Sequence, residues 1–185
     1  MDKMLSVVLP AYNEEQMIKK TAQVVGDLLE KEQIPYELVF VNDGSKDHTW
    51  EKILELKEER AHIKGVCFSR NFGKEAALYA GLERAKGDYV ITMDVDLQDP
   101  PYLIPKMIRC IEEENYDSVA TRRVTREGEP VIRSFFARQF YKLINKISDS
   151  NIVDGARDFR MMKRKMVDAI LTMPEYNRFT KGIFG

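Results

Sequence analysis

Short apolar runs alternate with longer amphipathic segments through the first 121 residues of the sequence. Runs of this length, bounded by turn residues, are typical of buried strands, and the segments between them have the length and periodicity of helices. A helix between successive strands supplies the crossover that parallel pairing requires. The sequence therefore predicts an α/β fold with a Rossmann-like, mainly parallel sheet and helices on both faces. The predicted strands are 5–9, 37–41, 63–68, 89–93 and 118–121, and the predicted helices are 15–31, 47–59, 74–85 and 102–114.

The alternation ends in residues 122–165, where the sequence predicts a charged loop over 122–130 and an amphipathic helix over 135–147. With 44% apolar side chains among 185 residues, the chain can bury one sizeable core. We therefore expect a single domain over 1–185. The sequence holds no stretch that approaches the ~20 apolar residues of a membrane-spanning helix.

Acidic and basic residues are segregated along the chain, although the formal net charge is only −1. Residues 1–118 hold 15 Lys and Arg against 23 Asp and Glu, whereas residues 119–165 hold 12 against 5. Such asymmetry indicates an anionic partner. The identity of that anion has to come from motifs.

Polar and acidic residues follow the first, second and fourth predicted strands. Ligands of an open parallel sheet bind beyond the carboxyl ends of its strands, so these loops form the candidate site. In an extended segment Asp94 and Asp96 would present oxygen atoms to one cation, with Gln98 continuing the row. Mg²⁺ or Mn²⁺ prefers such ligands and often takes only one or two carboxylates beside a diphosphate. A solvated turn is the alternative for the Asp-x-Asp pair, and a first-turn helix position is the alternative for Glu14 and Asp43.

Four ordered motifs carry a family resemblance: VLPAYNEE at 8–15, VNDGS at 41–45, NFGK at 71–74 and DVDLQDPP at 94–101. With these motifs the chain resembles the inverting GT-A enzymes of glycosyltransferase family 2. Within that family it is most similar to the polyprenyl-phosphate sugar transferases, which include dolichyl-phosphate mannose synthases and bacterial undecaprenyl-phosphate glucosyltransferases. The resemblance implies a donor half over 1–118 and an acceptor half over 119–185.

The resemblance further implies that the first half binds a nucleoside-diphosphate sugar of the UDP-glucose or GDP-mannose type. In the family, the loops after the first two strands hold the base and ribose, and the Asp-x-Asp loop holds a metal ion on the diphosphate. Asp96 is accordingly expected to be catalytic. A solvated first-turn side chain is the alternative for Lys74. The implied donor-binding residues are Pro10, Ala11, Tyr12, Glu14, Asn42, Asp43, Lys74, Asp94 and Val95, and the implied metal ligands are Asp94, Asp96 and Gln98.

The basic second half corresponds to the family's acceptor side. Arg122, Arg133 and Arg160 are expected to bind the phosphate of a polyprenyl phosphate, because guanidinium groups grip phosphate through bidentate contacts. Asp158 lies in the segment GARDFR at 155–160, which resembles the family's Gly-x-Phe-Arg type of motif. It is the second expected catalytic residue, as a base or as an orienting group. A phosphate acceptor with a second pKa of about 6 needs no strong base, whereas a sugar hydroxyl does.

The acceptor side also bears on location and partners. A helix over 135–147 with a basic edge would lie at a membrane surface, and a core helix or dimer surface is the plainer alternative. The expected partners are a nucleotide sugar, a polyprenyl phosphate and the cytoplasmic face of a membrane, with no nucleic acid and with homo-oligomerisation left open. Many relatives continue into transmembrane helices, so the end at 178–185 is interpreted as an acceptor loop cut short. Two other functions stay open: transfer to a saccharide or cell-wall hydroxyl, and nucleotide-sugar binding without catalysis.

Overall fold

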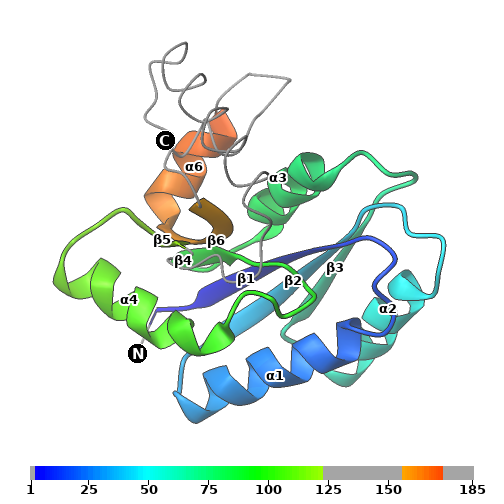
Figure 1. Ribbon diagram of the computed structural model, residues 1–185, viewed down its shortest axis with the longest axis horizontal. Helices are drawn as coiled ribbons and strands as arrows, with labels where there is room; N and C mark the ends of the chain where they lie inside the picture. Colours follow the sequence, from blue (N-terminus) through cyan, green and yellow to red (C-terminus); the bar gives the residue numbers. More distant parts are fainter. Residues whose placement is uncertain (1–2, 123–155, 173–185) are drawn as a thin grey trace, which may run out of the picture.

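The computed structural model describes residues 3–122 and 156–172, which form one sheet and the helices around it (Figure 1). The predicted helix 135–147 and Arg133 lie outside the described residues. The strands are β1 (Leu5–Ala11), β2 (Tyr36–Asn42), β3 (Ile63–Cys67), β4 (Tyr89–Thr92), β5 (Ser118–Arg122) and β6 (Ala156–Lys163). The helices are α1 (Ile18–Lys31), α2 (Thr49–Glu59), α3 (Lys74–Arg84), α4 (Ile104–Glu113) and α6 (Arg164–Thr172), with a 3-10 turn, η1 (Pro101–Leu103), before α4.

The strand order of the sheet is β3-β2-β1-β4-β6-β5. β1 pairs in parallel with β2 and β4, and β2 pairs in parallel with β3, which confirms the mainly parallel sheet. β6 pairs antiparallel with both of its neighbours, β4 and β5. The first residues of β6 therefore lie at the edge where the parallel strands end, with Arg160 opposite Thr92 and Ala156 opposite Arg122.

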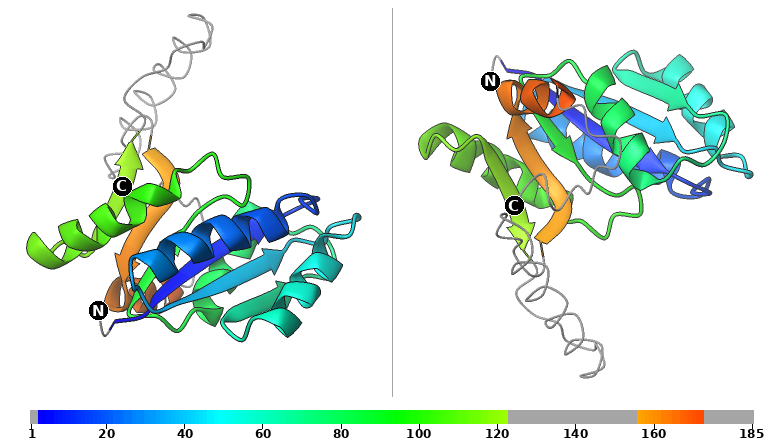
Figure 2. Two further views of the ribbon diagram at one scale, coloured as in Figure 1. Left: turned by 90° about the horizontal axis from the view of Figure 1, so that it is seen from below. Right: turned by 90° about the horizontal axis from the view of Figure 1, so that it is seen from above.

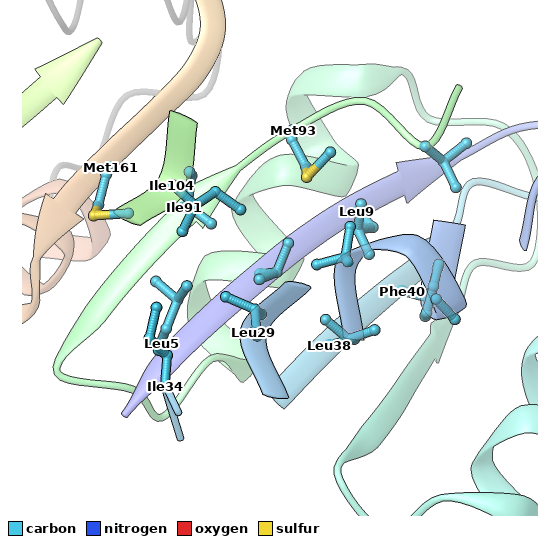
Figure 3. Packing of buried hydrophobic residues seen from close by; sticks show 14 of the residues in the cluster. Leu5, Leu9, Leu29, Ile34, Leu38, Phe40, Ile91, Met93, Ile104 and Met161 are labelled. Carbon is cyan, nitrogen blue, oxygen red and sulfur yellow. The ribbon is translucent and has the colours of Figure 1, made fainter. Parts of the chain in front are cut away.

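Helices cover both faces of the sheet, as the sequence predicts (Figures 1 and 2). α1, α2 and α4 pack on one face over side chains such as Leu5 and Phe40, and β6 contributes Met161 to this cluster (Figure 3). α3 and α6 pack on the other face, over Val8 and Val39. The alternation of Leu5, Val7 and Leu9 with Val8 explains why β1 reads as a continuous apolar run: both of its faces are buried.

β6 and α6 were not predicted. The eight residues of β6, ARDFRMMK, include four charged side chains, so neither an apolar run nor a regular alternation is visible. Phe159 and Met161 are nevertheless fully buried on the α4 side and Met162 on the α3 side. Hydrogen bonding to β4 and β5 and the burial of these side chains stabilise the strand, although its sequence lacks the pattern of a strand. Among the described residues, no helix is long and apolar enough to cross a membrane.

Candidate functional site

A cleft of about 460 Å³ opens at the carboxyl ends of the parallel strands. The loops after β1, β2, β3 and β4 contribute to its wall, together with the start of α3. This is the edge of an open α/β sheet where ligands bind. The lining residues are Pro10, Ala11, Tyr12, Glu14, Asp43, Asn71, Gly73, Lys74, Ala77, Asp94, Val95 and Asp96.

The loop after β1 supplies a wall with an acidic end. Tyr12 is 42% exposed at the cleft, while Ala11 is buried at the end of the strand. Glu14 belongs to the turn that leads into α1, and its backbone carbonyl accepts hydrogen bonds from the backbone N–H groups of Met17 at 2.9 Å and Ile18 at 3.3 Å, so Glu14 lies both at the helix start and in the cleft. Burial raises the pKa of the Glu14 carboxyl, and the negative charge of Asp96 raises it further. The carboxylates of Glu14 and Asp96 are therefore close enough to influence each other.

Asn13 holds the loops after β1 and β2 together. It has a positive φ of 55°, its backbone N–H donates to Ser45 Oγ at 2.9 Å, and its side-chain Oδ1 accepts from the backbone N–H of Lys46 at 2.8 Å. Asn42, an expected donor-binding residue, is buried and does not line the cleft. Its amide donates to Cys67 Sγ and accepts from the backbone N–H of Ser45, so it shapes this turn, and its donor-binding role stays a prediction.

Asp43 fixes the loop that leads into α3. The carboxylate is buried, and it accepts hydrogen bonds from the backbone N–H groups of Phe72 at 2.7 Å and Gly73 at 3.0 Å. α2 begins six residues later, at Thr49, so Asp43 is no first-turn residue of that helix. Asp43 lines the cleft as expected for a donor-binding residue, but the visible task of its two oxygens is to position the neighbouring loop. Each oxygen keeps a second lone pair for a ligand.

The Asp-x-Asp segment is a turn rather than an extended strand, because β4 ends at Thr92. Asp94 and Asp96 are both half-buried and line the cleft, with Val95 packed into the core between them. Leu97, within this turn, has a positive φ of 60°. Gln98 is exposed and lies outside the cleft lining, and its role as a metal ligand stays a prediction. Its backbone N–H donates to Asp96 Oδ1 at 3.0 Å.

Lys74 joins two parts of the site that are far apart in the sequence. As the first residue of α3, it places its Nζ atom 2.7 Å from Asp94 Oδ1 and 2.7 Å from Asp158 Oδ2. Burial alone would lower the pKa of the Lys74 ammonium, but the hydrogen bonds to Asp158 and Asp94 outweigh that effect and the pKa is raised. The ammonium is therefore charged at neutral pH and paired with both carboxylates, while 41% of the Lys74 side chain stays exposed in the first turn of α3.

Asp158 and Arg160 come from β6 and lie beyond the cleft lining. Asp158 reaches the site through Lys74, and its backbone carbonyl accepts a hydrogen bond from the Thr92 hydroxyl at the end of β4. Arg160 donates to Ser118 Oγ at 3.4 Å, and burial lowers the pKa of its guanidinium while the Asp158 charge opposes this. Arg122 ends β5 at the same edge of the sheet.

Asn71 and Gly73 belong to the NFGK motif, whereas Ala77 and Asp99 were not among the residues expected from the sequence. Asn71, Gly73 and Ala77 line the cleft, and Ala77 follows Lys74 by three residues, so the two lie on one face of α3. The three-residue spacing from Lys74 is therefore a sequence signal that points to Ala77. Asp99 is buried and accepts from the backbone N–H of Asp94, an arrangement that no sequence pattern signals.

The donor atoms around the cleft fit a hard divalent cation in part. Within residues 3–122 and 156–172, no three His, Cys, Asp or Glu side chains are grouped as a metal cluster. Asp96 offers a half-buried carboxylate with one oxygen bonded to a backbone N–H, and Glu14 lies close enough for the Asp96 charge to raise its pKa. Two carboxylates are enough for Mg²⁺ or Mn²⁺, because these ions often bind only one or two protein carboxylates and complete their coordination shell with water and phosphate oxygens.

The sequence matches a family model described as "Glycosyl transferase family 2" over residues 6–171. It is 43% identical over 180 residues to an uncharacterised glycosyltransferase of Synechocystis, covering 97% of this chain and 56% of that protein. It is 42% identical over 179 residues to a prophage bactoprenol glucosyl transferase homologue of Escherichia coli, covering 97% of this chain and 58% of that protein. The chain thus spans just over half the length of these relatives.

Solved structures share the fold at lower sequence identity. S. aureus TarS 1–349 superposes with a TM-score of 0.63 at 18% identity, covering 97% of this chain and 53% of that one. Glucosyl-3-phosphoglycerate synthase of Mycobacterium tuberculosis, crystallised with Mn²⁺, UDP-glucose and phosphoglyceric acid, gives a TM-score of 0.62 at 22% identity, covering 89% and 58%. These neighbours have the GT-A architecture, which confirms the expected fold.

Proposed function

The chain belongs to glycosyltransferase family 2, and from that premise we propose that it carries the sugar-transfer site of an inverting, metal-dependent enzyme. The donor is a nucleoside-diphosphate sugar, and the acceptor is a polyprenyl phosphate. The observation that carries the proposal is the single cleft wall that unites Tyr12, Asp43, Lys74, Asp94 and Asp96. Relatives about 42% identical are named bactoprenol glucosyl transferases, which favours glucose as the sugar and a polyprenyl phosphate as its acceptor.

The nucleotide is proposed to lie against the loops after β1 and β2. Tyr12 offers an exposed ring, and Asp43 offers lone pairs to base or ribose hydroxyls from a position that Phe72 and Gly73 hold fixed. Preorganised groups of this kind lower the entropic cost of binding. Asn42 acts indirectly, by holding the turn at Ser45.

A divalent cation is proposed to bind at Asp96, with Glu14 adjacent and with diphosphate and water completing its shell. When bound, the ion would neutralise the negative charge that develops on the departing diphosphate. Support comes from the place of Glu14 and Asp96 in one cleft lining, where burial raises the pKa of Glu14 and the nearby Asp96 charge raises it further. Structural neighbours crystallised with Mn²⁺ are consistent with this assignment.

The acceptor oxygen is proposed to attack the anomeric carbon from the side of β6. Asp158 lies there, tied to the donor loop by Lys74, and Arg160 follows two residues along the same face of the strand. A lipid phosphate is already ionised at neutral pH, so Asp158 orients the reaction rather than accepting a proton. Arg122 and Arg160 are proposed to hold the phosphate, together with Arg133.

The same proposal divides the chain into a donor half over 1–118 and an acceptor half over 119–185. The acceptor half is proposed to face the cytoplasmic surface of a membrane, where a polyprenyl phosphate is embedded. Basic residues near a surface of anionic lipid contribute about 1 kcal/mol each to such attachment.

A melting-temperature panel tests the donor site. The chain is heated with UDP, GDP, UDP-glucose or GDP-mannose, each with Mn²⁺ and again with EDTA. At a concentration near a hundred times Kd, a bound ligand stabilises by about 2.7 kcal/mol, so at least one pair is expected to raise Tm by about 5 °C. The rise should disappear with EDTA. No rise with any of the nucleotides, or an equal rise with EDTA, would contradict the proposed donor site.

A further inference from the structure

Lys74 places a fixed positive charge beside the proposed cation site. Its Nζ atom lies 2.7 Å from a carboxylate oxygen of Asp94 and 2.7 Å from one of Asp158. Because both oxygens contact one nitrogen, they are at most twice that distance apart. Without the ammonium, the two carboxylates would repel each other.

The backbone fixes where this ammonium can go. Lys74 is the first residue of α3, and the residue before it, Gly73, donates its N–H to the buried carboxylate of Asp43. Asp94 is held in turn by a backbone hydrogen bond to Asp99. The Lys74–Asp94 pair therefore joins two anchored loops. The ammonium is held beside Asp94 by the chain itself, so it does not pay the translational entropy that a free cation loses on binding.

A divalent cation and this ammonium compete for Asp94. Asp94 and Asp96 both line the cleft, but Lys74 neutralises only the first of them. The negative charges that face the cleft from the other elements are Glu14, from the loop after β1, and Asp43, which is occupied by backbone N–H groups. Asp96 and Glu14 are thus the carboxylates left for a cation, and a cation drawn to Asp94 would lie against the ammonium.

We propose that Lys74 is a positioning residue that withholds Asp94 from the metal ion and ties Asp158 to the donor loop. The ion then binds through Asp96, while the ammonium keeps Asp94 and Asp158 together. Lys74 thereby lowers the affinity of the cleft for the metal ion, and it fixes the position of Asp158 in the acceptor half relative to Asp94 in the donor half. This inference rests on the proposed function, because it concerns the same cation.

The test is the affinity for Mn²⁺ alone, measured as free Mn²⁺ by electron paramagnetic resonance during titration of the chain. Lys74→Met removes the charge and releases Asp94, so it is expected to bind Mn²⁺ about tenfold more tightly than the wild type. Lys74→Arg keeps the charge and should stay within about twofold of the wild type. Lys52→Met is the matched control, because Lys52 pairs with Glu55 on α2 and its loss changes the net charge equally.

Tightening confined to Lys74→Met supports the inference, since a merely structural defect at the cleft would weaken binding. Equal or weaker Mn²⁺ binding by Lys74→Met, with wild-type binding intact, overturns the inference and leaves the proposed metal site standing. If Lys74→Met does not melt cooperatively, Lys74→Gln replaces it in the same comparison. Absence of Mn²⁺ binding by every variant and the wild type overturns the proposed metal site itself, and the inference with it.

Discussion

Replacing Asp96 with Asn is expected to lower the rate of metal-dependent sugar transfer by at least about a hundredfold. The amide keeps the size of the side chain and can still accept the N–H of Gln98 through its oxygen. It removes the negative charge that we assign to the cation, and charge stabilisation of a leaving group is worth several kcal/mol. The measurement is the initial rate with saturating Mn²⁺ and a nucleoside-diphosphate sugar.

Asp27→Asn is the control for this change. Asp27 is exposed on α1, so its replacement alters the net charge equally without touching the cleft. The control should transfer sugar at the wild-type rate. Metal-stimulated transfer by Asp96→Asn within about threefold of the wild type would remove Asp96 from the proposed cation site.

Replacing Gly44 with Ala is expected to lower the free energy of unfolding by at least about 2 kcal/mol. Gly44 has a φ of 65°, and a Cβ atom there would lie 2.2 Å from the backbone carbonyl carbon of Arg70 and 2.5 Å from the backbone nitrogen of Asn71. Backbone atoms cannot move aside as a side chain can. The loop that carries Asn71 and Lys74 must shift, so nucleotide binding should weaken as well.

Gly65→Ala is the comparison for Gly44→Ala. A Cβ atom at Gly65 meets side-chain atoms of Ile53 and Trp50 at 3.0 Å rather than backbone atoms, and the φ of Gly65 is not positive. Urea unfolding should therefore show a smaller loss of unfolding free energy for Gly65→Ala than for Gly44→Ala. A loss for Gly44→Ala that is no larger than for Gly65→Ala would show that the close approach of the two loops is not required.

The parallel part of the fold follows from local sequence. β1 and β4 are apolar runs buried on both faces, and the helices between the strands have periodic apolar faces, so each element is visible in its own residues. β6 is not visible in this way. Four of its eight side chains are charged, and its place between β4 and β5 depends on pairing with strands 34 or more residues earlier in the chain.

The candidate site was predictable as a set of loops but not as a set of contacts. The rule that ligands bind beyond the strand ends brings Tyr12, Asp43 and Asp96 together without knowledge of the structure. The bridge from Lys74 to Asp158 spans 84 residues, and it exists because an antiparallel strand starts where its parallel neighbours end. Gln98 shows the opposite limit, since the sequence predicts an extended row with Asp94 and Asp96, whereas the segment is a turn and Gln98 lies outside the cleft lining.

The most direct measurement is sugar transfer from a radiolabelled nucleoside-diphosphate glucose to undecaprenyl phosphate, compared with undecaprenol and with an oligosaccharide acceptor. With Mn²⁺ or Mg²⁺ present, the label is predicted to enter the organic phase with undecaprenyl phosphate. Undecaprenol, which lacks the phosphate, should stay unlabelled, and EDTA should stop the reaction. Label on the oligosaccharide, with none on undecaprenyl phosphate, would contradict the proposed acceptor and assign the cleft to transfer onto a sugar hydroxyl.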